Sequence, residues 1–365
     1  MTDFRFVFGV MRYFCVRNVC DETFAASGDW ECDAGADCAG GADGARVAGA
    51  VPQMNALAES PLIVIVGPTA SGKSALAVWL ARELGGEVVA CDSTQLYRGF
   101  DVGTAKPTVE ERQGVAHHLI DVLDPREEST AGGYRERAIV VLEDLRARKQ
   151  LPIFTVGTGL YLRALLEGLA DVPLRSEELR ERLWASVAAH PPGHLHRILK
   201  RLDPVSAEKI APGDEQKLIR AVEVCLLARK PLSEVHRAGS NPLRGWRAVK
   251  IGLSPEREAL YQRIHARTEA MLAGGWMEEV RGLMASGLPP DAKPFDFIGY
   301  RELHAMVNGE MKLEEAKAAI QQATRRYAKR QLTWFRRDMQ IHWLSGFGQD
   351  AAIQQQALAL APDQL

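Results

Sequence analysis

Short apolar runs alternate with helical stretches along this chain. The apolar runs are rich in β-branched residues and are too short for helices, a pattern typical of strands covered on both faces. The four predicted strands are 62–66, 87–91, 151–155 and 247–253. The helices predicted between and after them are 75–84, about 130–148 and about 255–284. Strands that alternate with helices predict an α/β fold with a parallel sheet.

A different pattern occupies the middle of the chain. From about Asp171 to Asn241 the residues are polar with helical spacing, and proline and glycine interrupt them without any strand signal. We interpret 171–241 as a small helical insertion. The α/β core then consists of residues 54–170 and 242–365.

Composition excludes some classes of protein. The chain has 365 residues, of which 46% are hydrophobic and 25% charged, so a mainly disordered protein is excluded. No run approaches 18 uninterrupted apolar residues, and we expect neither a membrane span nor a membrane partner. Residues 54–365 carry a net charge of +2, so nucleic-acid binding requires local basic patches.

Residues 1–53 differ from the rest of the chain. Their net charge is −4, and they hold four of the six cysteines, with spacings unlike those of common zinc sites. An apolar stretch broken by Arg5, Gly9 and Arg12 fits a signal peptide poorly. We predict a poorly ordered extension or a start-site artefact, because Met54 opens a more compact beginning. Clustered cysteines without an export signal favour the cytoplasm.

The first strand leads into a phosphate-binding motif. Residues 67–74 read G-x4-G-K-S and stand between a predicted strand and a predicted helix, the context that a P-loop requires. Backbone N–H groups and the helix N-terminus bind phosphate oxygens, Lys73 neutralises charge, and Ser74 is placed to ligate Mg²⁺. The motif predicts a phosphate or diphosphate ligand without specifying ATP. The predicted phosphate-binding residues are Gly67, Pro68, Thr69, Ala70, Ser71, Gly72, Lys73 and Ser74.

Asp92 follows the second predicted strand. Ligands of open parallel sheets bind at the carboxyl ends of the strands, so we expect Asp92 to face the same crevice as Lys73. A carboxylate there could act as a general base or bind a metal through water, and capping the turn after it is the alternative. In the loop 99–107, Thr104 and Lys106 are further groups suited to phosphate, on weaker evidence.

Two segments near the C-terminus have the composition of an RNA-binding surface. Residues 325–337 contain six cations and no acidic residue, with Arg326, Arg330 and Arg337 on a different side of the predicted helix from an apolar stripe. In the segment Asp296-Phe-Ile-Gly-Tyr-Arg301, Tyr300 and Arg301 suit stacking on and pairing with a nucleic-acid strand. A solvated charged face is the alternative for the first segment.

Taken together, these motifs resemble those of the tRNA dimethylallyltransferases. The resemblance rests on GPTASGKS at 67–74, DSTQLYRG at 92–99 and GTAKP at 103–107. Three further segments agree, HHLID at 117–121, VGTGLY at 156–161 and the basic helix at 325–337. Val156 stands where the family usually has glycine, and this change leaves the hydroxyl of Thr158 in place.

The resemblance implies the fold, the reaction and the site. It implies a P-loop NTPase-like sheet flanked by helices, transfer of a dimethylallyl group from dimethylallyl diphosphate to N6 of the adenosine beside the anticodon, and Mg²⁺. Asp92, Thr69 and Arg267 are the implied catalytic residues, with Arg267 also on the diphosphate. The resemblance also implies that the insertion 171–241 grips tRNA, and we expect a cytoplasmic monomer. The implied tRNA contacts are Asp92, Ser93, Thr94, Gln95, Thr158, Gln216, Lys217, Leu218, Ile219, Arg220, Asp296, Phe297, Ile298, Gly299, Tyr300, Arg301, Arg326 and Arg330.

Three other functions share part of this pattern. A P-loop kinase of small molecules also needs Lys73, Ser74 and Asp92, but it does not explain the basic helix. An isopentenyltransferase of free adenine nucleotides shares the front half, and the rear half argues against it. A non-catalytic RNA-binding module leaves Asp92 and Arg267 unexplained.

Overall fold

The computed structural model describes residues 59–170, 172–237 and 241–361. The predicted extension 1–53 lies outside these residues. Six strands form one sheet in which every pairing is parallel. The sheet order is β3-β2-β4-β1-β5-β6. The strands are β1 (Ser60–Val66), β2 (Gly86–Cys91), β3 (His117–His118), β4 (Leu151–Val156), β5 (Trp246–Leu253) and β6 (Ile341–Leu344).

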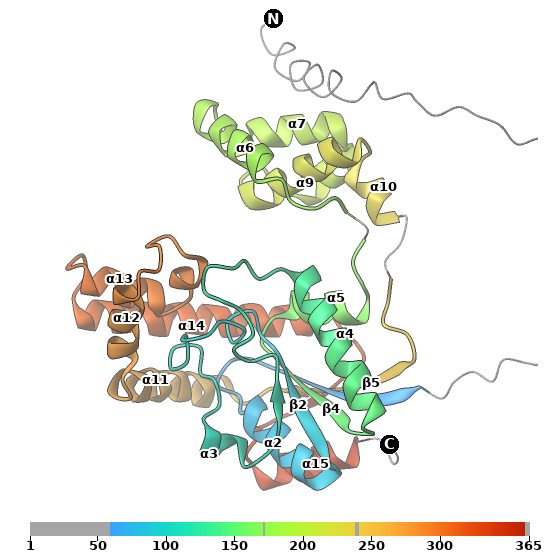
Figure 1. Cartoon of the computed structure of the whole chain (residues 1–365), viewed down its shortest axis with the longest axis vertical. Helices are drawn as coiled ribbons and strands as arrows, with labels where there is room; N and C mark the ends of the chain where they lie inside the picture. The colour runs from blue at the N-terminus through green and yellow to red at the C-terminus, as the bar shows by residue number, and fades with distance from the viewer. Residues whose placement is uncertain (1–58, 171, 238–240, 362–365) are drawn as a thin grey trace, which may run out of the picture. The chain divides into compact units, whose positions relative to one another are not determined.

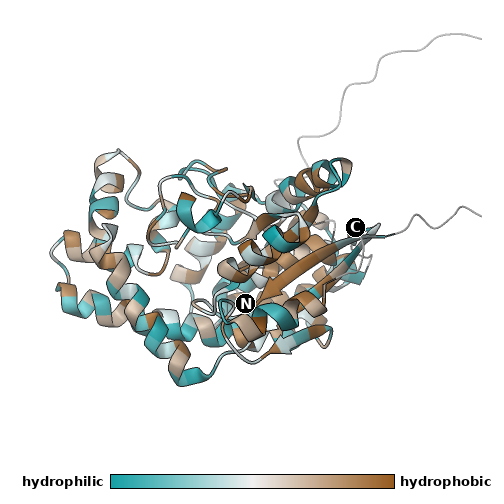
Figure 2. Ribbon diagram, turned by 90° about the horizontal axis from the view of Figure 1, so that it is seen from below, coloured by the Kyte–Doolittle hydropathy of each residue, from teal (hydrophilic) through white to brown (hydrophobic). Residues whose placement is uncertain are grey.

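Helices cover both faces of this sheet (Figure 1). α2 (Lys73–Leu84) and α15 (Ala351–Ala359) pack on one face, and α4 (Ala131–Ala147) and α5 (Gly159–Leu166) pack on the other. The alternation of side chains along β1 explains its apolar sequence, because Ile63 and Ile65 belong to one buried cluster and Val64 to the other. Figure 2 shows the hydrophobic sheet between more polar helices. The predicted α/β class is confirmed.

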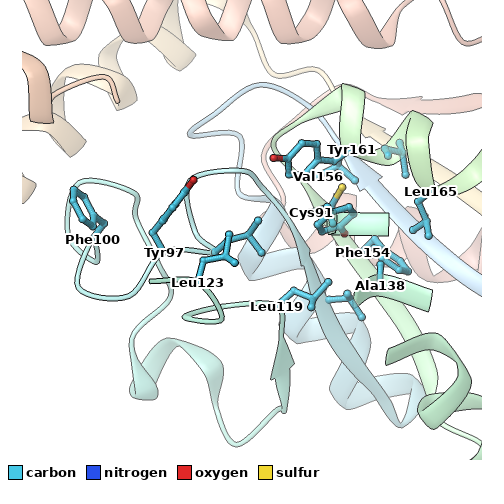
Figure 3. Packing of buried hydrophobic residues seen from close by; sticks show 14 of the residues in the cluster. Cys91, Tyr97, Phe100, Leu119, Leu123, Ala138, Phe154, Val156, Tyr161 and Leu165 are labelled. Carbon is cyan, nitrogen blue, oxygen red and sulfur yellow. The ribbon is translucent and has the colours of Figure 1, made fainter. Parts of the chain in front are cut away.

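The buried cluster continues to the edge of the sheet where the strands end. Figure 3 shows Cys91, Val156 and Tyr161 there, from β2, β4 and α5. Tyr161 donates to or accepts from the hydroxyl of Ser129 at 2.7 Å, so its polar end is satisfied inside the apolar layer. This packing fixes the ends of two strands whose following residues reach the site.

The helix predicted at 255–284 is instead two helices. α11 (Arg257–Ala273) ends before Gly274, and α12 (Trp276–Ala285) starts after Gly275, whose φ of 94° is left-handed. The apolar pattern continues through the break, which is why periodicity alone joined the two. The remaining helices of this part are α3 (Val109–Arg112), the 3-10 helix η1 (Lys293–Asp296), α13 (Tyr300–Val307) and α14 (Leu313–Phe335).

Residues 172–237 are helical and form a buried cluster of their own. Leu183, Leu199 and Ile219 are among its members. No strand occurs in this described stretch. The helices are α6 (Glu177–Ala189), α7 (His194–Leu202), α8 (Pro204–Lys209), α9 (Glu215–Ala228) and α10 (Leu232–Arg237). Across the described residues, no helix is both long and apolar enough to cross a membrane.

Candidate functional site

The P-loop runs from the end of β1 to the start of α2. Gly67 has a φ of 146°, and a Cβ there would lie 2.9 Å from the carbonyl oxygen of Leu253. Gly72 has a φ of 88°, and a Cβ there would lie 2.8 Å from the backbone nitrogen of Gly348. Only glycine combines such backbone angles with so close an approach. The predicted glycines therefore shape a loop that is closed on one side by a segment near the C-terminus.

Lys73 lies at the first position of α2 and turns back over the loop. Its Nζ donates to the carbonyl oxygens of Gly67 at 3.1 Å and Pro68 at 2.9 Å. Burial lowers the pKa of Lys73 to about 8, and the cation of Arg267 adds to this while Asp92 opposes it. The ammonium is thus held beside the loop with its charge only partly compensated.

A pocket of about 500 Å³ brings the predicted catalytic residues together. Thr69 and Lys73 line it from the P-loop, Asp92 from the end of β2, and Arg263 and Arg267 from α11. Burial also lowers the pKa of Arg267, although a guanidinium stays charged at neutral pH. Three cations and the carboxylates of Asp92 and Glu111 therefore face a space bordered by P-loop backbone. The excess of positive charge beside backbone N–H groups suits an anion.

Asp92 reaches this pocket across an intervening strand. β4 lies between β2 and β1, and Gly157 follows β4 at the point where the carboxylate passes. A Cβ on Gly157 would lie 1.9 Å from Oδ2 of Asp92, so only glycine leaves room for the side chain. Thr94 donates to Oδ1 through its backbone N–H at 2.9 Å and its hydroxyl at 2.7 Å. Asp92 thus caps the turn with one oxygen, and Oδ2 receives no hydrogen bond from the described residues.

The residues after Asp92 are bound to the loop after β4. Thr158 accepts from the backbone N–H of Ser93 at 3.0 Å and donates to its hydroxyl oxygen at 3.1 Å. The side chain of Gln95 donates to the carbonyl oxygens of Thr104 and Ala105, both at 3.3 Å. Four predicted contacts, Ser93, Thr94, Gln95 and Thr158, therefore lie together around Asp92.

A second pocket of about 300 Å³ adjoins the first. Thr69, Asp92, Arg267 and Tyr327 line both pockets. The lining of the second pocket holds more large apolar side chains than that of the first, beside the charged Arg267, Asp296 and Arg330. These apolar residues are Met271, Trp276, Phe297, Ile298 and Ile320. Asp92 therefore stands where a cationic pocket meets an apolar one.

Tyr300 is a correction to the sequence analysis. We expected its ring to stack on a nucleic-acid strand, but the side chain is fully buried. Its hydroxyl donates to Glu279 Oε1 at 2.5 Å and accepts from the backbone N–H of Gly103 at 3.1 Å. Burial next to this carboxylate raises the pKa of Tyr300 well above its ordinary value. The ring therefore packs the core behind the second pocket, while Asp296 and Arg301 are exposed.

Lys106 is a second correction. Its residue type and position in the loop 99–107 suggest a phosphate contact, but its Nζ is buried. This nitrogen donates to the carbonyl oxygen of Tyr97 at 2.5 Å and to Asp101 at 2.7 Å. It also contacts Asp121. Lys106 therefore holds the loop after β2 together and is absent from the pocket lining. The hydroxyl of Thr104 likewise donates to a backbone carbonyl, that of Phe100, at 2.5 Å.

The basic segment forms the end of α14. Arg326 and Arg330 are exposed, and Arg330 also lines the second pocket. None of the cations Arg326, Lys329, Arg330, Arg336 and Arg337 forms an ion pair with a carboxylate of the described residues. These exposed cations at the end of α14 and just beyond it are available to an anionic partner.

The predicted contacts in α9 belong to the separate helical cluster. Leu218 and Ile219 are buried in it, and Arg220 forms an ion pair with the buried Glu223 at 2.7 Å. Gln216 and Lys217 are exposed. Leu218, Ile219 and Arg220 therefore have structural roles within the helical stretch.

Comparisons with known proteins agree with the resemblance seen in the sequence. A family described as IPP transferase matches residues 95–338, and one described as isopentenyl transferase matches residues 60–125. The tRNA dimethylallyltransferase of Koribacter versatilis is 52% identical over 299 residues, covering 82% of this chain and 97% of that protein. The chain belongs to the tRNA dimethylallyltransferase family. The tRNA dimethylallyltransferase of Solibacter usitatus is 49% identical over 298 residues, with the same coverage.

Solved structures of the tRNA dimethylallyltransferase family share the fold. The tRNA isopentenylpyrophosphate transferase of Bacillus halodurans is 36% identical with a TM-score of 0.61, and covers 83% of this chain and 96% of that one. A eukaryotic dimethylallyltransferase described as acting on tRNA is 27% identical with a TM-score of 0.71, covering 82% and 78%. Both likenesses extend through most of the chain.

Three residues of this tRNA dimethylallyltransferase family member were missed by sequence reasoning. Gly157 makes room for Asp92, and Tyr327 and Gln331 of α14 donate to its carbonyl oxygen at 2.9 Å and 2.8 Å. Gly157 had a weak signal, since it opens the G-T-G segment after a predicted strand. Tyr327 and Gln331 had none, because their partners lie more than 150 residues away in sequence.

Proposed function

We propose that this protein transfers the dimethylallyl group of dimethylallyl diphosphate to N6 of the adenosine next to the anticodon of tRNA, giving N6-isopentenyladenosine. One observation carries the proposal, namely that Asp92 stands between a P-loop pocket with three cations and an apolar pocket. The activity for which the relatives are named supports the same reaction. We further propose that the protein acts as a cytoplasmic monomer.

The cationic pocket suits the diphosphate leaving group. Negative charge grows on the diphosphate as its bond to the allylic carbon breaks. Loop amides, Lys73 and Arg267 are fixed in place before the reaction, so stabilising this charge requires little reorganisation. The loss of one such donor typically costs roughly 3–4 kcal/mol of the barrier.

The apolar pocket suits the five-carbon group and the acceptor base. Adenine cannot react while stacked, so it must leave the anticodon loop and enter the pocket. Its amine is a poor nucleophile because the lone pair is delocalised, and it must lose a proton during attack. Oδ2 of Asp92 has a free acceptor position beside both pockets and is our candidate for the general base.

Mg²⁺ fits the first pocket as a partner of the diphosphate. The Ser74 hydroxyl and the Asp92 carboxylate are oxygen donors that line it. No group of three or more His, Cys, Asp or Glu in the described residues forms an all-protein site, and Mg²⁺ commonly takes few protein ligands with phosphate oxygens and water. We propose that Ser74 holds the ion, which when bound neutralises phosphate charge.

A direct assay tests the function. The protein is incubated with dimethylallyl diphosphate, Mg²⁺ and an unmodified anticodon stem-loop, and nucleoside mass spectrometry should show an added C5H8 on adenosine. Asp92→Ala should abolish transfer and leave stem-loop binding largely intact. Free AMP is the control acceptor, and faster modification of AMP than of the stem-loop would contradict a tRNA substrate. Near-wild-type turnover by Asp92→Ala would remove Asp92 from the role of base.

A further inference from the structure

Gln331 links the two sides of the proposed reaction site. It lies on the inner face of α14 and is 5% exposed. Its Oε1 accepts from the backbone N–H of Thr69 at 2.7 Å, and its Nε2 donates to the carbonyl oxygen of Gly157 at 2.8 Å. One side chain thus connects the P-loop with the residue beside Asp92.

The chemistry of the two partners requires an amide. The N–H of Thr69 can only donate and the carbonyl oxygen of Gly157 can only accept, so the bridging group must accept at one end and donate at the other. An apolar side chain of similar length leaves the Thr69 N–H without this acceptor. A carboxylate would place a second acceptor oxygen against the carbonyl oxygen of Gly157, which is unfavourable even though Tyr327 also donates there. Buried polar groups without a partner are unfavourable, so the arrangement of Thr69 and Gly157 depends on Gln331.

Both partners adjoin groups with roles in the proposed chemistry. Thr69 lies at the junction of the two pockets. Gly157 leaves the space that Oδ2 of Asp92 occupies. A shift of either backbone segment therefore changes the distance between the bound diphosphate and the base.

We infer that Gln331 is a positioning residue that fixes the P-loop and the carboxylate of Asp92 at their reactive separation. This inference rests on the proposed transfer reaction and adds a determinant of its rate. Tyr327 also binds the Gly157 end of this connection, because its hydroxyl donates to the same carbonyl oxygen of Gly157 at 2.9 Å. The Thr69 end has Gln331 as its side-chain acceptor within the described residues.

Gln331→Met tests the inference, with Gln322→Met as a matched control. Methionine keeps the length and volume of glutamine but loses both hydrogen bonds. Gln322 is on the same helix, exposed, and outside both pockets. We expect Gln331→Met to lower kcat roughly 10- to 100-fold, since misplacement by about 1 Å has effects of this size. KM for the stem-loop should change less than about twofold, and Gln322→Met should behave as wild type.

A second measurement does not depend on catalysis. Amide hydrogen exchange at Thr69 should be slow in the wild-type protein and in Gln322→Met, and at least about tenfold faster in Gln331→Met. Unchanged Thr69 exchange in Gln331→Met, or kcat within about twofold of wild type, would overturn the inference. If the wild-type protein transfers no prenyl group, the proposed function is wrong, and so is the proposed effect of Gln331 on the rate of transfer. Exchange that depends on Gln331 in that case would still establish the bridge itself.

Discussion

At the scale of single residues, Gly157 controls the approach of Asp92. The space for Oδ2 exists because residue 157 has no Cβ. Asp92 could not move elsewhere without losing the two hydrogen bonds from Thr94. A residue with no side chain is therefore as important to the site geometry as the carboxylate itself.

Gly157→Ala should displace the Asp92 carboxylate and lower kcat by about 100-fold, the usual effect of a misplaced catalytic group. Gly282→Ala is the control, because Gly282 lies inside α12 with no atom within 4 Å of an added Cβ. That substitution should leave kcat unchanged and raise stability by up to about 1 kcal/mol. Steady-state kinetics measure kcat and thermal unfolding measures the stability of the two variants. An unchanged kcat in Gly157→Ala would show that the reaction does not need the space beside Oδ2 of Asp92.

The lowered pKa of Lys73 predicts how diphosphate binding depends on pH. The pKa of Lys73 in the folded protein is about 8, against an ordinary value of 10.5. In the protein without bound diphosphate, Lys73 therefore loses its proton as the pH rises through about 8. An anionic ligand prefers the protonated form, so affinity for inorganic diphosphate should fall above pH 8 by up to about tenfold per pH unit. Calorimetry at pH 7, 8 and 9 measures this dependence.

The variant Lys73→Gln separates the effect of Lys73 from that of other titrating groups. It should bind diphosphate more weakly at every pH and should lack the decline above pH 8. The same decline in the variant and in wild type would assign the pH dependence to another group. The lowered pKa also means that stability rises with pH between about 8 and 10.5, where the unfolded chain binds more protons.

At the scale of elements, α14 has two faces with different roles. Ala328, Gln331 and Phe335 are buried against the core. Arg326 and Arg330 point to solvent on the same helix. Because 3.6 residues make one turn, a single helix can present cations outward and hold the P-loop inward.

The double variant Arg326→Ala/Arg330→Ala should weaken tRNA binding about tenfold at low salt. The dependence of log affinity on log salt concentration should decrease by about one to two units, as expected when two phosphate contacts are lost. Arg137→Ala on α4 is the control, since Arg137 is exposed and away from both pockets. Salt titrations of stem-loop binding measure the effect, and equal losses in the double variant and the control would argue against a tRNA face on α14.

At the scale of the whole molecule, the helical stretch begins and ends at neighbouring points of the core. The backbone N–H of Leu243 donates to the carbonyl oxygen of Leu166 at 3.0 Å. Arg135 contacts both ends, donating to the carbonyl oxygen of Leu165 at 3.1 Å and to that of Asn241. The core chain on either side of the stretch is therefore already joined, which supports treating 171–241 as an insertion.

Replacing residues 172–240 with a short flexible linker should leave a folded core. Diphosphate affinity should stay within about twofold, because the cationic pocket draws no residue from this stretch. Affinity for tRNA should fall at least about tenfold if the insertion contributes phosphate contacts. Circular dichroism, calorimetry and stem-loop binding measure these properties. Loss of folding or of diphosphate binding would contradict an independent insertion, and unchanged tRNA affinity would contradict its proposed role.

Patterns among neighbouring residues were enough to predict most elements and the chemistry that is local in the chain. The β-branched runs specified four of the six strands, and the glycine spacing specified the P-loop, because both signals depend on neighbouring residues. The runs did not predict the two short outer strands β3 and β6. The sequence placed Asp92 correctly, since a residue after a parallel strand must reach the ligand edge of the sheet. It failed where the deciding contact was distant. Residue type could not reveal that Tyr300 and Lys106 are buried. The break at Gly274-Gly275 is a different case, because the glycine pair is a local signal that the continuous apolar pattern masked.

Which groups meet in the site depends on how distant segments of the chain pack together. The sheet order put β4 between β1 and β2, and thereby made Gly157 the neighbour of Asp92. Packing of α14 against that edge brought Gln331 to Thr69, 262 positions away in sequence. A local pattern encodes the conformation of a segment, whereas the contacts between distant segments follow from burying all apolar faces at once. Most chemical groups of the site could therefore be predicted from the sequence, but Tyr327, Gln331 and the arrangement of all these groups could not.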